Sequence, residues 1–208
     1  MTHLQKLLIA THNPAKKQEL GSGFAPLKQE KMQLLFVDDL NIKKDPEETG
    51  KTFLENAKLK AHYFAHLSNL PTVADDGGIE IDALGGEPGV HSKRWLGREA
   101  TDAELIAHTV KNMEQVDPAK RTAQFTVCLF YYNPLTHYEI WVTESLKGHI
   151  TLTPSGLAQK GFPYRALFIV HPYGKYYDEL SAAEHHKSNH RLKAVQKIIP
   201  LIKSDLIQ

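Results

Sequence analysis

Val73-Ala74-Asp75-Asp76-Gly77-Gly78-Ile79-Glu80-Ile81-Asp82 is the stretch around which the chain is organised, and it continues as Ala83-Leu84-Gly85-Gly86-Glu87-Pro88-Gly89-Val90. It begins as a short apolar strand that ends in two adjacent carboxylates. Two glycines follow, and the alternating run 79–82 predicts a half-buried strand before a turn rich in glycine and proline. Buried carboxylates need partners, so the pair indicates a site that holds a metal or handles a proton. The alternative is a polar turn between two strands.

The composition is that of a globular protein. The chain has 208 residues, 41% hydrophobic and 24% charged, which predicts one or two compact units with a sizeable core. The net charge of +1 gives no strong attraction to nucleic acid or to a membrane, so neither is expected as a partner. The single cysteine, Cys128, excludes an internal disulfide and fits a reducing cytoplasm. No signal peptide and no bilayer-spanning stretch is expected.

The N-terminal segment predicts a strand, a turn and a helix. Residues 6–10 form the strand, Asn13 is a good N-cap and Pro14 suits the first helical position. The helix is expected over 15–20 and to end at Gly21 and Gly23. Amides at such a helix N-terminus bind anions, and Lys16 lies in the first turn, so a phosphate site is predicted. The alternative is an exposed basic turn.

The next segment joins an acidic loop to an amphipathic helix. A strand is expected over 34–37, the acidic loop spans 45–50, and Thr52 caps a helix from Phe53 to about residue 67. Apolar side chains form one stripe of this helix. Glu55, Asn56 and Lys60 fall together in another sector, which is free to face a cleft.

The rest of the chain adds helices and a cluster of strands. Capping boxes at 101–104 and 181–184 predict two helices, and a hairpin is expected from 124–132 and 138–143. A short strand is predicted at 149–153, bracketed by glycines, and another at 167–170. The final helix is expected from His190 to about residue 204, with Asn189 as a candidate cap and a bend or break at Pro200. This order predicts an α/β fold, bordering on α+β, with a mixed sheet.

Four separated segments offer complementary chemistry. Residues 11–16 offer amides and a lysine for phosphates, and Glu48, Glu55 and Asp76 offer the oxygen ligands that Mg²⁺ prefers beside substrate phosphates. Two aromatic residues offer faces for stacking a base. Donors to base edges or phosphates come from the C-terminal region. This combination suits a nucleoside triphosphate hydrolase, whereas dinucleotide-fold and P-loop motifs are absent from the sequence. The aromatic residues are Phe162 and Tyr164, and the C-terminal donors are His185, His190 and Arg191.

Seven motifs carry a resemblance to a known family. Residues 11–16 are similar to a T-G-N-x-x-K phosphate loop, and 48–61 to an E-T-G…F-x-E-N-A-x-x-K-A segment. Residues 74–78 and 84–90 match A-D-D-S-G and L-G-G-x-P-G, and the match continues through Ser92-x-Arg94. Residues 161–166 and 189–191 correspond to G-F-G-Y-D-P and S-H-R. On these motifs, nearly end to end, the chain resembles the inosine triphosphate pyrophosphatase family.

The resemblance implies a two-lobed mixed-sheet fold with a long central substrate cleft, formed by one domain over 1–208, and a homodimer. It implies Mg²⁺-dependent conversion of a nucleoside triphosphate and water into a monophosphate and pyrophosphate. Asp76 is then the proton acceptor and a metal ligand, and Glu48 the second metal ligand. Glu55, Asp75 and Arg94 are supporting candidates. The implied substrate-binding residues are Thr11, His12, Asn13, Pro14, Ala15, Lys16, Lys60, Gly77, Phe162, Pro163, Tyr164, Arg165, His185, His190 and Arg191.

Departures from the family pattern are not scattered, and most of the positions that read the base have changed. His12 replaces a glycine of the phosphate loop, and Gly77 replaces the serine of D-D-S-G. Arg165 stands where the family has an acid, and His185 and Asn189 replace a lysine and a serine. The carboxylates are retained, so triphosphate hydrolysis is expected to persist while selectivity for inosine and xanthosine nucleotides changes.

Two other interpretations stay open. One is a non-catalytic nucleotide-binding or regulatory protein, which would not need Glu48 and Asp76. The other is a metal site built from His185, His186 and His190, although its spacing is loose and no cysteine supports it.

Overall fold

The computed structural model describes residues 5–157, 159–171 and 173–206. A seven-stranded sheet has the order β2-β1-β3-β4-β5-β6-β7. β1 pairs in parallel with β2 and β3, whereas β6 pairs antiparallel with β5 and β7, so the sheet is mixed, as predicted. The strands are β1 Gln5–Ala10, β2 Met32–Phe36, β3 Thr72–Ile81, β4 Thr122–Tyr132, β5 Glu139–Ile150, β6 Phe168–Val170 and β7 Lys175–Tyr176.

Five α-helices occur in the described residues, and the predicted N-caps of α1 to α4 are confirmed. Thr52 caps α2 by accepting from the Glu55 amide, and capping boxes begin α3 and α4 at Thr101 and Ser181. Pro200 lies inside α5 without ending it, so the expected break does not occur. The helices are α1 Pro14–Phe24, α2 Phe53–Ser68, α3 Asp102–Met113, α4 Ala182–Ser188 and α5 His190–Leu206.

The organising stretch is one strand, not two strands joined by a turn. β3 runs without interruption from Thr72 to Ile81, through both aspartates and both glycines. The two aspartates are buried within it, 1% and 7% exposed, as in a strand of a covered sheet. The turn interpretation of the carboxylate pair is therefore wrong.

Gly148 does not separate two strands, because β5 continues through it to Ile150. Gly148 pairs with Val170 of β6, and a Cβ at this position would lie 2.2 Å from the Ile169 carbonyl oxygen. The glycine therefore permits close approach of two backbones within a strand. Of the short strand predicted at 149–153, residues 149–150 are the end of β5 and residues 151–153 are not in a strand.

α1 likewise continues through Gly21 and Gly23 to Phe24, four residues beyond its predicted end. A Cβ at Gly23 would lie 3.1 Å from a Val195 methyl carbon, so this glycine serves the packing of α1 against α5. Helix-breaking propensity is outweighed there by tertiary contact.

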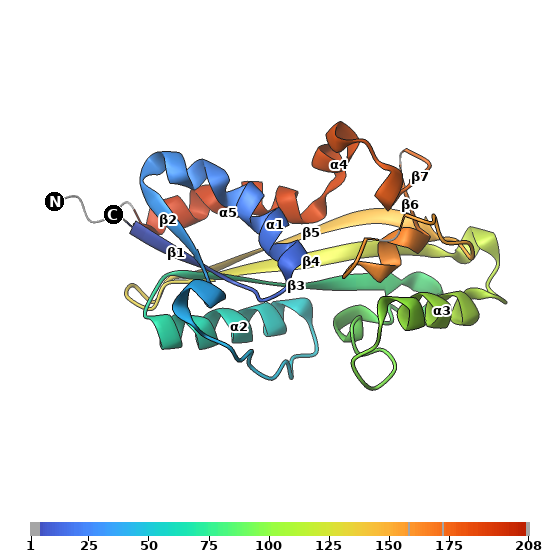
Figure 1. Ribbon diagram of the computed structural model, residues 1–208, viewed down its shortest axis with the longest axis horizontal. Helices are drawn as coiled ribbons and strands as arrows, with labels where there is room; N and C mark the ends of the chain where they lie inside the picture. The colour runs from blue at the N-terminus through green and yellow to red at the C-terminus, as the bar shows by residue number, and fades with distance from the viewer. Residues whose placement is uncertain (1–4, 158, 172, 207–208) are drawn as a thin grey trace. The chain divides into compact units, whose positions relative to one another are not determined.

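The chain divides into two compact units, each with its own core. The first unit comprises Met1–Asp76, Val127–Glu144 and Arg191–Gln208, and the second comprises Gly77–Thr126 and Ser145–His190. In the first unit, α1 and α5 cover one face of the sheet and α2 covers the other (Figure 1). The core of the second unit includes Ile79, Phe125 and Phe168. Among the described residues, no helix is long and apolar enough to cross a membrane.

Candidate active site

Asp75 and Asp76 are neighbours in sequence but point to opposite faces of the sheet. Successive side chains of a strand alternate between the two faces. Asp75 contacts residues of α1 and α5, which cover one face, and Asp76 contacts residues of α2, which covers the other (Figure 1). The alternation gives the two carboxylates different partners and different chemistry.

Asp76 and Glu48 converge on one cation. Lys60 Nζ lies 2.8 Å from Glu48 Oε1 and 3.1 Å from Asp76 Oδ1. Asn56, one turn earlier on α2, donates to Asp76 Oδ2 at 3.3 Å and accepts from the Gly50 amide at 2.8 Å. Asn56 thereby connects Asp76 to the loop that carries Glu48.

Lys60 stays protonated because of these two acids. Burial disfavours its charged form, but the carboxylates of Asp76 and Glu48 outweigh burial and raise the pKa of Lys60 well above its ordinary value. The site therefore combines a fixed positive charge with two carboxylates.

The same two carboxylates fit Mg²⁺. Both already lie within hydrogen-bonding distance of a single cationic atom, so their oxygens can approach one ion together. Mg²⁺ is commonly held by one or two carboxylates together with waters and substrate phosphates. In the part of the chain that the structure describes, no group of three or more His, Cys, Asp or Glu residues could hold a metal. An ion here would draw its remaining ligands from water and substrate.

Asp75 is the centre of a buried ion network. Its Oδ2 atom lies 3.0 Å from Lys16 Nζ and 3.1 Å from Arg191 Nε, and Arg191 Nη1 lies 2.6 Å from Glu19 Oε2. Burial opposes the ionised Asp75, but Lys16 and Arg191 outweigh it and hold the pKa of Asp75 well below its ordinary range. Asp75 Oδ1 is buried and has no hydrogen-bond partner among the described residues.

Lys16 is half-buried and Lys60 is buried, and their pKa values shift in opposite directions. Burial lowers the pKa of Lys16, and the Asp75 carboxylate offsets this only in part because Lys60 and Arg191 add nearby positive charge. Lys60 has two carboxylates and Lys16 has one. An added anion would therefore stabilise the protonated form of Lys16 more than that of Lys60.

The predicted phosphate segment begins α1 as expected, but its amides are already occupied. Asn13 Oδ1 accepts from the Ala15 amide at 2.9 Å and from the Lys16 amide at 3.3 Å, and Pro14 has no N–H to offer. Thr11 Oγ1 accepts from the Asn13 amide. An anion at this helix terminus would compete with the Asn13 cap.

Glu55 does not share the orientation of Asn56 and Lys60. Its side chain is exposed and accepts from the Lys51 amide at 2.5 Å, whereas Asn56 and Lys60 are buried against Asp76. Glu55 occupies the third helical position, where a carboxylate stabilises the helix N-terminus. Of the three residues, Asn56 and Lys60 lie against Asp76, whereas Glu55 contacts the Lys51 amide at the start of α2.

In the second unit, Arg165 is enclosed by aromatic rings. Its guanidinium carbon lies 3.5 Å from the centroid of the Phe162 ring and 4.4 Å from that of Tyr177, and Nη1 donates to Gln159 at 3.1 Å. One face of Phe162, the residue predicted to stack on a base, is thus covered by Arg165. Arg165 is only 3% exposed.

The other base-reading candidates of the second unit are also packed. Tyr164 is buried, its hydroxyl donates to the Ser92 carbonyl at 2.5 Å, and burial raises its pKa. Pro163 begins the 3₁₀ helix Pro163–Leu167 that holds these residues. The rings of His190 and Phe125 are stacked, with their centroids 5.7 Å apart. The rings of His185 and Tyr177 form a T-shaped contact, with their centroids 5.3 Å apart.

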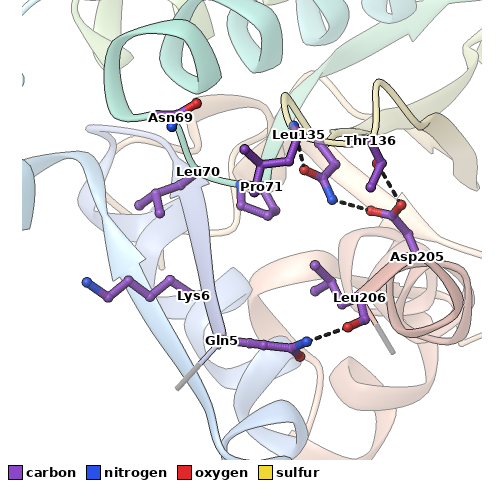
Figure 2. A pocket seen from close by; sticks show the side chains of 10 residues that line it. Gln5, Lys6, Asn69, Leu70, Pro71, Leu135, Thr136, Asp205 and Leu206 are labelled. Atoms are coloured by element: carbon purple, nitrogen blue, oxygen red, sulfur yellow. Dashed lines mark hydrogen bonds between the residues drawn. The ribbon is translucent and has the colours of Figure 1, made fainter. Parts of the chain in front are cut away.

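Gly77 lies half-buried within β3. Arg94 lines a cavity of about 660 Å³ in the second unit, together with Trp95 and His108. A separate cavity of about 440 Å³ lies in the first unit, where Asp205 accepts hydrogen bonds from Asn133 and Thr136 (Figure 2). Neither cavity is lined by the two candidate metal ligands.

Two contacts of the candidate residues escaped the sequence-based prediction. Glu19 holds Arg191, and Tyr177 forms the second aromatic face against Arg165. Glu19 lies one helical turn after Lys16, a spacing that could have placed it beside the same network. No sequence signal marks Tyr177, because its contact joins segments that only the fold brings together.

Comparisons with known proteins confirm the resemblance carried by the motifs. A family model described as the Ham1 family matches residues 7–201. A dITP/XTP pyrophosphatase of Thermus thermophilus is 40% identical over 198 residues, covering 95% of this chain and 92% of the relative. One from Yersinia pseudotuberculosis is 35% identical over 206 residues, covering 96% and 99%. A solved HAM1 protein structure from Coxiella burnetii matches with a TM-score of 0.84 at 29% identity, covering 96% and 99%. The chain therefore belongs to the Ham1 family.

Proposed function

We propose that the protein is a Mg²⁺-dependent nucleoside triphosphate pyrophosphohydrolase, which converts a triphosphate and water into a monophosphate and pyrophosphate. The observation that carries the proposal is the convergence of Glu48 and Asp76 on Lys60 Nζ, at 2.8 and 3.1 Å. The names of the relatives from Thermus thermophilus and Yersinia pseudotuberculosis, dITP/XTP pyrophosphatase, support the reaction class.

Asp76 is the proposed proton acceptor. Water attacks the α-phosphorus, the bond from that phosphorus to the oxygen of the leaving pyrophosphate breaks, and the water proton passes to Asp76. Asn56 holds Asp76 in place through its 3.3 Å hydrogen bond. Bound Mg²⁺, held by Glu48 and Asp76, would neutralise charge on the triphosphate.

The two lysines have separate proposed roles. Lys60 keeps its positive charge beside both carboxylates and neutralises phosphate oxygens next to the reacting centre. Lys16, at the start of α1 and bound to Asp75, gives the phosphate segment its charge. Arg191 is assigned a positioning role here, because its guanidinium is buried between Asp75 and Glu19.

The proposed substrates are non-standard purine nucleotides, ITP, dITP and XTP, with base selectivity that differs from the family pattern. Gly77 offers no hydroxyl, and Arg165 places a cation where the family has an acid. The stacking of Arg165 on Phe162 supports a changed base contact. A homodimer is also proposed from the resemblance, and light scattering would test it.

A nucleotide panel with and without Mg²⁺ tests the proposal. We expect pyrophosphate release from purine triphosphates that requires Mg²⁺, and a Glu48→Gln variant that needs on the order of tenfold more Mg²⁺ for half-maximal rate. Glu47→Gln, at an exposed neighbouring position, is the matched control and should behave as the wild type. Nucleotide binding without hydrolysis would instead support a regulatory binding protein.

A further inference from the structure

His12 has both ring nitrogens occupied by acceptors. Nε2 lies 2.8 Å from the Ile42 carbonyl oxygen, and Nδ1 lies 3.0 Å from Asp45 Oδ1. A carbonyl oxygen and an ionised carboxylate can only accept, so both nitrogens must donate. An imidazole that donates from both nitrogens carries a proton on each, and His12 is therefore an imidazolium in this arrangement.

The charges around His12 agree with that protonation state. Asp38 Oδ1 lies 3.5 Å from Nε2, and Asp38 in turn pairs with Lys17 of α1. Phe64 of α2 forms a T-shaped contact with the His12 ring, with the two ring centroids 6.1 Å apart. Burial disfavours the charged ring, but the Ile42 carbonyl and the Asp45 carboxylate outweigh it and raise the pKa of His12.

The position of His12 gives these contacts a consequence for the candidate site. His12 belongs to the segment 11–16 and directly precedes Asn13, the cap of α1. Ile42 and Asp45 belong to the loop that leads to Glu48. His12 is thus a direct connection between the segment predicted to bind phosphates and the loop that carries a candidate metal ligand.

We propose that His12 is a positioning residue which, as an imidazolium, fastens the loop 42–48 to the segment 11–16 and so holds Glu48 beside Asp76. The proposal rests on the proposed function for its effect on catalysis, and it reassigns His12 from substrate contact to loop anchoring. The ring contacts two acidic residues and a carbonyl, none of which attracts a phosphate.

Hydrogen exchange on the metal-free protein tests the anchoring directly. In His12→Gln, which keeps one neutral donor but loses the charge, backbone amides of 42–50 should exchange on the order of tenfold faster than in the wild type. His66→Gln, which removes an exposed histidine of α2 in the same unit, is the matched control and should leave these amides unchanged. Asp45→Asn removes the acidic partner and should reproduce the His12→Gln result.

Mg²⁺ dependence tests the catalytic consequence. The Mg²⁺ concentration for half-maximal pyrophosphate release should rise about tenfold in His12→Gln, with a smaller change in the KM of the Mg-saturated nucleotide. Unchanged amide exchange and unchanged Mg²⁺ dependence in both variants would overturn the proposal. If the wild type released no pyrophosphate, the proposed function would fail, whereas the exchange measurement would still decide whether His12 anchors the loop.

Discussion

At the scale of single residues, strand geometry makes two adjacent aspartates into different functional groups. Asp75 meets Lys16 and Arg191 on one face of the sheet, and Asp76 meets Lys60 and Asn56 on the other. The first is enclosed by cations, and the second shares its cation with Glu48. This difference leaves Asp76 as the group suited to a metal and a proton.

Arg191→Met tests the structural role of the buried network. Removing the guanidinium takes away one ion-pair partner of Asp75 and one of Glu19. The free energy of unfolding should therefore fall by about 3–5 kcal/mol. Urea denaturation measures this loss. Arg98→Met, which removes a fully exposed ion pair with Glu104, is the control and should have little effect. An equally small effect of both variants would show that the network does not stabilise the fold.

Arg165→Leu tests the proposed base contact. The guanidinium covers one face of Phe162, so its loss should change the ratio of kcat/KM values for ITP, XTP and GTP by roughly tenfold. The Mg²⁺ requirement should stay the same, because the proposed metal ligands are Glu48 and Asp76. Steady-state kinetics on the three nucleotides would measure both quantities, and a uniform loss on all three would argue for a purely structural role.

At this scale, residue type and the family motifs singled out Glu48, Asp76 and Lys60, which the fold brings together. Residue type also singled out Asn13, whose capping contacts are local. The contacts of Arg191 and Arg165 were not predictable. Arg191 is positioned by Glu19, which is far away in the sequence, and Arg165 by the packing of Phe162 and Tyr177 around it. The sequence alone does not distinguish a buried arginine from an exposed one.

At the scale of elements, glycines were the main source of error. Gly23 was predicted to end a helix and Gly148 to bracket a short strand, but each lies inside an element where another segment approaches closely. β3 likewise runs through two glycines. The N-caps of α1 and α2 and the capping boxes of α3 and α4 were predicted correctly, because a cap is satisfied within four residues, whereas close packing depends on the whole fold.

Gly148→Ala tests the reason given for the continuous β5. The added methyl group would lie 2.2 Å from the Ile169 carbonyl oxygen, so β5 and β6 must separate locally. We expect the free energy of unfolding to fall by about 1–3 kcal/mol. Lys147→Ala, at the exposed preceding position of β5, is the control for the loss of strand propensity. Equal stability of the two variants would contradict the close approach.

At the scale of the whole molecule, pH should act on stability through His12. Because the pKa of His12 is raised in the folded state, its contribution is fully present below the ordinary value of about 6.5 and is lost as the pH rises through the folded-state pKa. Urea midpoints of the wild type and His12→Gln should therefore differ at pH 6 and converge towards pH 9. A difference that grows with pH would contradict the charged state assigned to His12.

The central claim is that Asp76 accepts the proton in a Mg²⁺-dependent pyrophosphohydrolase. The most direct test measures pyrophosphate release from ITP at saturating Mg²⁺ in the wild type and in Asp76→Asn. Asparagine keeps the size of the side chain but cannot accept the proton, so kcat should fall by about 10²–10⁴-fold while the protein remains folded. Retention of most of the wild-type kcat by a folded Asp76→Asn protein would contradict the account.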